Sequence, residues 1–144
     1  YAGPDGISSF VPTGTATYDG GLVGLYFETG FGTVYTRADM TAAANFDNGS
    51  ITFSTNGTED FNPATGASGI DRSELDIPAT VFTPASSNNK FIDLAISDGS
   101  GLTGSAEIAL FGSSGEEMAG IGNLTDDNDA TRVHLISFTG QIPD

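Results

Sequence analysis

The sequence predicts an all-β domain, and within that class an eight-stranded antiparallel up-and-down β-barrel. Helix signals are nearly absent, because no window places apolar residues at i, i+3, i+4 and i+7 over three turns. Short runs of strand character recur along the chain, and clusters of Gly, Asn, Asp and Ser separate them. The length of 144 residues fits one domain with a core of its own.

Eight segments have strand character, and in chain order they cover residues 14–24, 36–46, 50–56, 75–82, 91–97, 104–111, 117–123 and 132–140. The alternation is clear within 104–111, where Ala106, Ile108 and Leu110 share one face. Ser105 and Glu107 fall on the other face. This pattern predicts a sheet with one dry and one wet side.

Turn residues between the segments indicate how neighbouring strands pair. Asn48-Gly49 separates two predicted strands, and an Asn-Gly pair supplies the positive φ of a tight hairpin turn. Turns rich in Gly, Ser or Asp at residues 98–101, 112–115 and 125–129 give the last four strands short connections. Short connections pair sequential strands antiparallel, which predicts up-and-down topology.

With no helix to cover an open face, eight strands hide their edges either as a sandwich or as a closed barrel. Gly24, Gly120 and Gly122 lie within strand segments and favour the barrel, because glycine permits the sharp coiling of a small closed sheet. An eight-stranded barrel leaves room inside for side chains or for one small ligand.

Two stretches stand outside the strand pattern. Residues 1–12, from Tyr1 to Pro12, are predicted as an extended N-terminal segment, and residues 13–144 as a single barrel domain. Residues 57–74 are predicted as a long connection, and connections longer than about 12–15 residues are usually functional or disordered. We expect this connection and the loop at residues 28–33 to carry a partner site, since loops vary more freely than barrel walls.

The charge balance restricts the class of partner. Nineteen acidic residues against four basic ones give a net charge of -15 and no basic patch, which excludes nucleic acid and anionic membranes. A basic protein or a cation would be attracted instead, and a saline or extracellular setting suits such a surface. No apolar stretch approaches about 18 residues, so no membrane span and no signal peptide are predicted. The absence of cysteine excludes disulfides.

Residue patterns for catalysis are sparse, and the sequence predicts a protein that is not an enzyme. His134 is the only histidine, and the serines of the Gly-rich turns lack the strand-turn-helix setting of a nucleophile. Glu107 and Glu117, on adjacent predicted strands, are the alternative as paired carboxylates for glycoside cleavage. The acidic residues at 126–129 lack the spacing of a calcium loop, so they are interpreted as a solvated turn and no metal site is predicted.

The predicted ligand-binding residues are Phe31, Tyr35, Phe61 and His134. The three aromatic residues lie in or beside Gly-containing loops, where such side chains often anchor a protein contact. Tyr26 and Phe27, nearby, are interpreted either as contact residues or as core. His134 is either a barrel-wall residue or an accessible haem ligand beside apolar surface, and haem is the one cofactor considered.

Short glycine and aromatic motifs carry a resemblance. The run Gly14-Thr15-Ala16-Thr17-Tyr18-Asp19-Gly20, followed by Asn45-Phe46-Asp47-Asn48-Gly49, is similar to the first hairpin of the barrel domains of bacterial transferrin-binding protein B. The pair Phe111-Gly112 leading into Glu117-Met118-Ala119-Gly120 is similar to a later hairpin of that family. The closing Ile136-Ser137-Phe138-Thr139-Gly140 resembles its final strand.

This resemblance implies a secreted or surface-exposed bacterial binding protein. It would recognise a host or partner protein, or an iron-containing ligand such as haem, through loops at one barrel end, and its location would be extracellular or on the bacterial cell surface. The alternative function is a structural subunit or decoration of an extracellular assembly. In that case the segment from Tyr1 to Pro12 would join a neighbour by adding a strand to its sheet.

Overall fold

The computed structural model describes residues 13–82, 86–87, 90–112, 115–126 and 131–143, so the predicted N-terminal segment at 1–12 lies outside the described residues. Within these ranges ten strands form one sheet, and the single helical element is a short 3-10 turn. Every strand pair is antiparallel, which confirms the all-β fold class. No helix in this part of the chain has the length and apolar character needed to cross a membrane.

Seven long strands carry the sheet: β1 (Thr15–Glu28), β2 (Gly32–Asn45), β3 (Ser50–Phe61), β7 (Lys90–Ser97), β8 (Leu102–Phe111), β9 (Glu117–Asp126) and β10 (Arg132–Gln141). The shorter elements are β4 (Ser68–Asp71), η1 (Ser73–Leu75), β5 (Thr80–Phe82) and β6 (Ser86–Ser87). Seven of the eight predicted strand segments correspond to the seven long strands.

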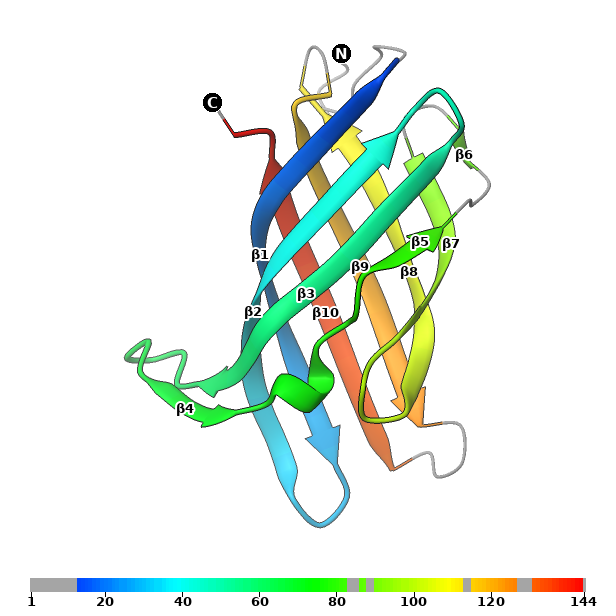
Figure 1. Ribbon diagram of the computed structural model, residues 1–144. Coiled ribbons are helices and arrows are strands. Elements are labelled where there is room, and N and C mark those ends of the chain that lie inside the picture. The colour runs from blue at the N-terminus through cyan, green and yellow to red at the C-terminus, as the bar shows by residue number, and fades with distance from the viewer. Residues whose placement is uncertain (1–12, 83–85, 88–89, 113–114, 127–130, 144) are drawn as a thin grey trace.

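Long strands that follow one another in the chain pair as neighbours, except β3 and β7, and β10 returns to pair with β1. The hydrogen-bonded order is β4-β3-β2-β1-β10-β9-β8-β7-β6, with β5 also paired to β3. Figure 1 shows the long strands running side by side and slanted around a shared interior. The predicted up-and-down topology is therefore confirmed for the long strands.

The prediction of a closed eight-stranded barrel is not confirmed, because no pairing among the described residues joins β3 or β5 to β7. A closed eight-stranded barrel needs the predicted strand at 75–82 in this position, and only its end, β5, pairs with β3. Pro78 interrupts the segment, since proline cannot donate to a ladder. Leu75 and Ile77 are buried in the core instead, and Thr55 fixes Ile77 through its backbone N–H and its hydroxyl oxygen.

The predicted long connection at 57–74 is also shorter than expected. Strand β3 continues through residues 57–61, and β4 folds back to pair with it (Figure 1). Between the Arg37–Glu59 and Asp39–Asn56 pairs, β3 holds one residue more than β2. Gly57 lies in this bulge with φ +68°. A glycine at the start of the predicted connection therefore permits a β-bulge inside a strand and does not mark a turn.

Side chains fill the interior of the sheet. The alternation predicted for β8 is confirmed, since Ala106, Ile108 and Leu110 are buried. At the centre, the ring of Phe138 on β10 lies 4.9 Å from that of Phe53 on β3, measured between centroids. A Cβ atom added to Gly120 would lie 2.4 Å from the Phe138 ring, so this strand glycine makes room for a core aromatic residue.

The hairpin predicted at Asn48-Gly49 joins β2 to β3. Gly49 has φ +73°, as the Asn-Gly pair predicts. The connection spans residues 46–49 rather than two residues, and the Asn48 side-chain oxygen accepts a hydrogen bond of 3.0 Å from the backbone N–H of Ser50. The Asn side chain thus closes the turn that glycine permits.

Candidate functional site

One row of apolar side chains crosses the outer side of four neighbouring strands. Phe61 on β3 is the register partner of Tyr35 on β2, and Tyr35 is the partner of Leu25 on β1. Leu25 is in turn the partner of Leu135 on β10. Directly opposed residues on one face have Cβ atoms about 4.5–5.5 Å apart, so these four side chains form a continuous row.

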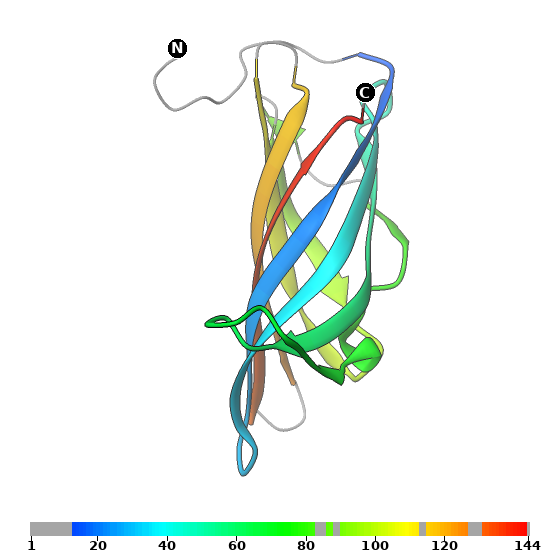
Figure 2. The ribbon, with the colours of Figure 1, turned by 90° about the vertical axis from the view of Figure 1, so that its left-hand side faces the viewer.

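We call the surface around this row the outer apolar face, and it consists of Val23, Leu25, Phe27, Tyr35, Phe61 and Leu135. Phe61 is half-buried, and the other five side chains are between 38% and 53% exposed. Ile121 on β9, also exposed, lies diagonally beyond Leu135 and extends the surface. Figure 2 shows β10, β1 and β2 side by side on this side of the molecule. Contiguous exposed apolar surface of this kind marks interaction sites.

Tyr35 and Phe61 form an aromatic pair that a charged group holds in place. Their rings pack edge to face with centroids 6.3 Å apart, and the guanidinium carbon of Arg37 lies 4.8 Å from the Phe61 centroid. Arg37 donates from Nε to Glu59 Oε2 at 2.7 Å and from Nη2 to the Gly66 carbonyl and the Ser68 hydroxyl at 3.0 Å. This contact with Arg37 holds the pKa of the Glu59 carboxyl below its ordinary value. Arg37 therefore holds the Phe61 side of the aromatic pair in place next to β4.

Phe31 lies at the turn between β1 and β2 and is half-exposed. The guanidinium carbon of Arg72 lies 4.6 Å from the Phe31 centroid and 5.8 Å from that of Tyr26. Arg72 donates from Nε to Asp60 Oδ1 at 3.0 Å, and this hydrogen bond to Asp60 raises the pKa of the Arg72 guanidinium. Phe31 thus packs on a fixed cation at one end of the sheet, whereas Tyr35 and Phe61 pack against each other on its outer wall.

His134 lies inside the sheet and is 3% exposed. Its Nε2 atom is 2.9 Å from the Thr36 hydroxyl, and its ring packs edge to face on Tyr26 with centroids 5.9 Å apart. Burial lowers the pKa of His134 from 6.5 to about 4, so the ring is neutral at physiological pH. The haem hypothesis needs an accessible imidazole, and this one is enclosed. His134 is a residue of strand β10 whose side chain is buried.

Tyr26 and Phe27 separate into the two classes that the sequence left open. Tyr26 is buried and donates its hydroxyl hydrogen to Glu28 Oε1 at 2.7 Å, whereas Phe27 faces outward. A Cβ atom on Gly24 would lie 2.9 Å from His134 Nε2 and from the Thr36 hydroxyl oxygen. Gly24 therefore leaves the space in which His134 and Thr36 meet.

The acidic residues considered for catalysis or metal binding do not converge in the described structure. Glu107 pairs with Ile121 and Glu117 pairs with Phe111, which separates the two carboxyl-bearing positions by four residues along β9, or about 13 Å at 3.3 Å per residue. Asp126 accepts hydrogen bonds from Arg132, the shorter at 2.8 Å, and residues 127–129 lie outside the described part of the chain. No group of three metal-ligating side chains is found among the described residues.

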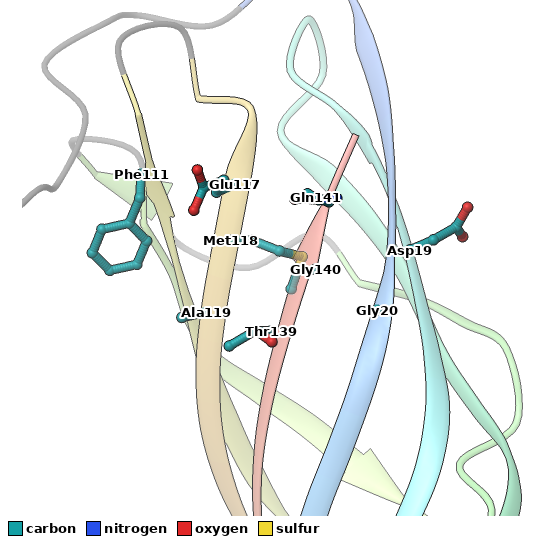
Figure 3. Close-up of a pocket in the computed structure, with 9 residues that line it drawn as sticks. All are labelled: Asp19, Gly20, Phe111, Glu117, Met118, Ala119, Thr139, Gly140 and Gln141. Carbon is teal, nitrogen blue, oxygen red and sulfur yellow. The ribbon is translucent and has the colours of Figure 1, made fainter. Parts of the chain in front are cut away.

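A shallow hollow lies on the outer wall where β1, β10, β9 and β8 adjoin (Figure 3). Gly20, Ala119 and Gly140 contribute little side-chain volume to it, and Asp19 and Phe111 point away from each other in Figure 3. The hollow exists because small residues leave the wall thin. Its labelled side chains do not converge on a common point (Figure 3).

Of the predicted ligand-binding residues, the structure brings Tyr35 and Phe61 together and leaves Phe31 and His134 elsewhere. The sequence reasoning missed Val23, Leu25 and Leu135. A signal was present in residues 22–27, where apolar residues occupy consecutive positions around one glycine instead of alternating with polar ones. An antiparallel strand with one wet face alternates, so an unbroken apolar run indicates a strand with both faces apolar.

No protein-family model and no curated protein matches the chain. Among solved structures it is similar to the Tyr-167-Ala and Trp-176-Ala double mutant of transferrin-binding protein B, a vaccine antigen from Haemophilus parasuis Hp5, with a TM-score of 0.59, 11% identity, and coverage of 92% of this chain and 26% of that one. The isotype 1 transferrin-binding protein B from serogroup B Neisseria meningitidis gives a TM-score of 0.52, 11% identity and the same two coverages.

The chain therefore spans about a quarter of the length of these neighbours. At 11% identity the likeness concerns the fold alone. It agrees with the barrel-like arrangement of the long strands and with the resemblance noted in the sequence. The chain is therefore similar in fold to about a quarter of transferrin-binding protein B.

Proposed function

We propose that this domain is a non-catalytic binding module that recognises a partner protein through its outer apolar face, in an extracellular or bacterial cell-surface setting. The observation that carries the proposal is the continuous row of Phe61, Tyr35, Leu25 and Leu135 across four strands. Aromatic and aliphatic side chains held on hydrogen-bonded strands are pre-ordered, so little conformational entropy is lost when a partner covers them.

The fold likeness supports the binding role, because the neighbours carry the name of transferrin-binding proteins. The proposed contact surface differs from the barrel-end loops expected from the sequence. Of the two loops expected there, residues 57–61 are strand, and Phe31 in the other packs on Arg72. The non-catalytic assignment is supported by the enclosed His134 and by the separation of Glu107 from Glu117.

Site-specific photo-cross-linking tests the proposal. A benzophenone amino acid replaces Leu25 in one variant and Ser105 in the other, and both are exposed to the secreted and surface proteins of the producing cells. Ser105 is the matched control, because it lies on the same register row as Leu135 and Asn123 but on β8. We expect a discrete protein adduct from position 25 and none from position 105. Identical products at both positions, or no adduct from position 25, would refute the proposal.

Purified transferrin is the first defined partner to examine, since it is the protein named in the neighbours. Surface plasmon resonance compares the unmodified domain with Tyr35→Ser. If transferrin is the partner, the variant binds at least about tenfold more weakly, as expected for loss of one hot-spot aromatic residue. Equal binding by the two proteins would place any transferrin contact outside the outer apolar face.

A further inference from the structure

We infer that the partner surface covering the outer apolar face is cationic, with lysine or arginine side chains beside an apolar projection. This inference rests on the proposed function, and it names the chemistry of the partner.

Uncompensated carboxylates border the outer apolar face toward the start of β1. Asp39 lies two residues beyond Arg37 on the outward side of β2, and Asp19 lies four residues before Val23 on the outward side of β1. Successive outward positions on a strand are about 7 Å apart, so Asp39 lies one such step and Asp19 two steps from the row of Val23 and Arg37. Both side chains are exposed. A partner seated on the face therefore needs one basic side chain to pair with Asp39 and a second one to pair with Asp19.

Three of the four basic side chains are paired with other carboxylates, and the fourth, Lys90, lies on β7. Arg37 is paired with Glu59, Arg72 with Asp60 and Glu74, and Arg132 with Asp126. Lys90 and Glu107 together line a second hollow, between β7, β8 and β9. Since these four are all the basic residues of the chain, the described structure offers no ion pair to Asp19 or Asp39. Their charges are left for a partner to neutralise.

The same charges argue against a second copy of the chain as the occupant. Each copy carries a net charge of -15, so two outer apolar faces in contact would place like-charged borders beside each other. A cationic partner gains from the same field, because opposite charges steer it toward the surface and fix its orientation. Electrostatics of this kind weakens as salt screens exposed charges.

Two synthetic peptides test the inference. One alternates Lys and Leu around a central Phe, and the other carries Glu in place of every Lys. Fluorescence anisotropy measures the binding of each to the whole domain at 20 and 500 mM NaCl, and sedimentation of the domain alone measures self-association. We expect the Lys peptide to bind at least tenfold more tightly at the lower salt concentration, and the Glu peptide not to bind.

Matched variants locate the charge effect. The double variant Asp19→Asn with Asp39→Asn should weaken Lys-peptide binding at least fivefold. The control Asp93→Asn with Glu107→Gln also removes two exposed carboxylates, on β7 and β8, and Asn tolerates the positive φ of 57° at position 93, so it should change binding less than twofold. Equal weakening by both would show attraction to overall charge only, and would overturn the inference.

The remaining outcomes separate this inference from the proposed function. If both peptides bind equally and Tyr35→Ser abolishes both, the outer apolar face binds partners but its charge preference is refuted. If Tyr35→Ser changes neither peptide, the proposed function itself fails. If the domain sediments as a dimer that Tyr35→Ser dissociates, the occupant is a second copy and the inference is overturned.

Discussion

Strands β1 and β8 are both walls of the same sheet, yet their outward sides differ. On β8 the outward positions include Ser105 and Glu107, whereas on β1 they include Val23, Leu25 and Phe27. The inward side of each strand is largely buried. Folding requires one apolar side per strand, because only one side packs on the core. The outward apolar side of β1 is therefore not needed for packing the core. Stability should depend on the inward sides of the strands, and binding should depend on their outward sides.

The largest effect on stability is expected inside, for Phe138→Ala. Phe138 is buried, packs on Phe53 and covers Gly120, so its loss leaves a cavity at the centre of the core. We expect the free energy of unfolding, measured in urea, to fall by about 3–5 kcal/mol. The control is Leu135→Ala on the outward side of the same strand, with an expected loss below about 1 kcal/mol. Similar losses for the two variants would contradict the comparison.

The next effect concerns pH, through His134. Because its pKa is about 4 in the folded protein and 6.5 ordinarily, the unfolded chain binds a proton between these values that the folded chain does not. The contribution of His134 therefore lowers stability as pH falls from about 6.5 to 4, by roughly 3–4 kcal/mol at most, at about 1.4 kcal/mol per pKa unit.

The variant His134→Gln isolates this contribution, since it keeps a polar group near Thr36 and cannot titrate in this range. Between pH 7 and pH 4 the unmodified protein should lose more free energy of unfolding than the variant does. Parallel pH profiles for the two proteins would show that His134 titrates normally and is not enclosed.

A smaller loss is expected at the β2–β3 turn, for Gly49→Val. No atom lies within 4 Å of a Cβ built on Gly49, so the cost comes only from its φ of +73°. A β-branched residue in this conformation should cost about 1–2 kcal/mol. Gly49→Asn should cost less, because Asn tolerates positive φ, and thermal unfolding measures both. A melting temperature that Gly49→Val leaves unchanged would mean that this turn is built differently.

The sequence predicts the inward sides of the strands well, because alternation and turn chemistry are local signals. The prediction from sequence fails where the same residue type is compatible with two different local structures. The sequence predicts a loop that starts at Gly57, but the positive φ that suits a turn also suits a bulge inside β3. The segment at 75–82 has strand composition, but Pro78 and the inward burial of Leu75 and Ile77 divert it from a ladder.

The candidate site was predictable in part for the same reason. The sequence identifies Tyr35 and Phe61 as exposed aromatic residues, but their pairing depends on the strand register beyond the bulge at Gly57, which no local pattern predicts. The positions of Phe31 and His134 depend on Arg72 and Thr36, which lie 41 and 98 positions away in the chain. Long-range contacts of this kind decide whether an aromatic or a histidine side chain is free.

The smallest effect on stability, and the sharpest test of the comparison, is expected for Tyr35→Ala on the outer apolar face. Tyr35 is 48% exposed and contacts Phe61 at its edge, so its truncation should change the free energy of unfolding by less than about 1 kcal/mol. The same change should weaken binding to the partner identified by cross-linking by about 1–2 kcal/mol or more, because a central aromatic residue with a packed neighbour is a typical hot spot.

Phe31→Ala is the matched control, since its ring is similarly exposed but packs on Arg72 at the end of the sheet. Because one aromatic ring is lost in each variant, a binding defect confined to Tyr35→Ala separates the outer wall from the loop end, whereas a defect confined to Phe31→Ala would return the contact surface to the loops.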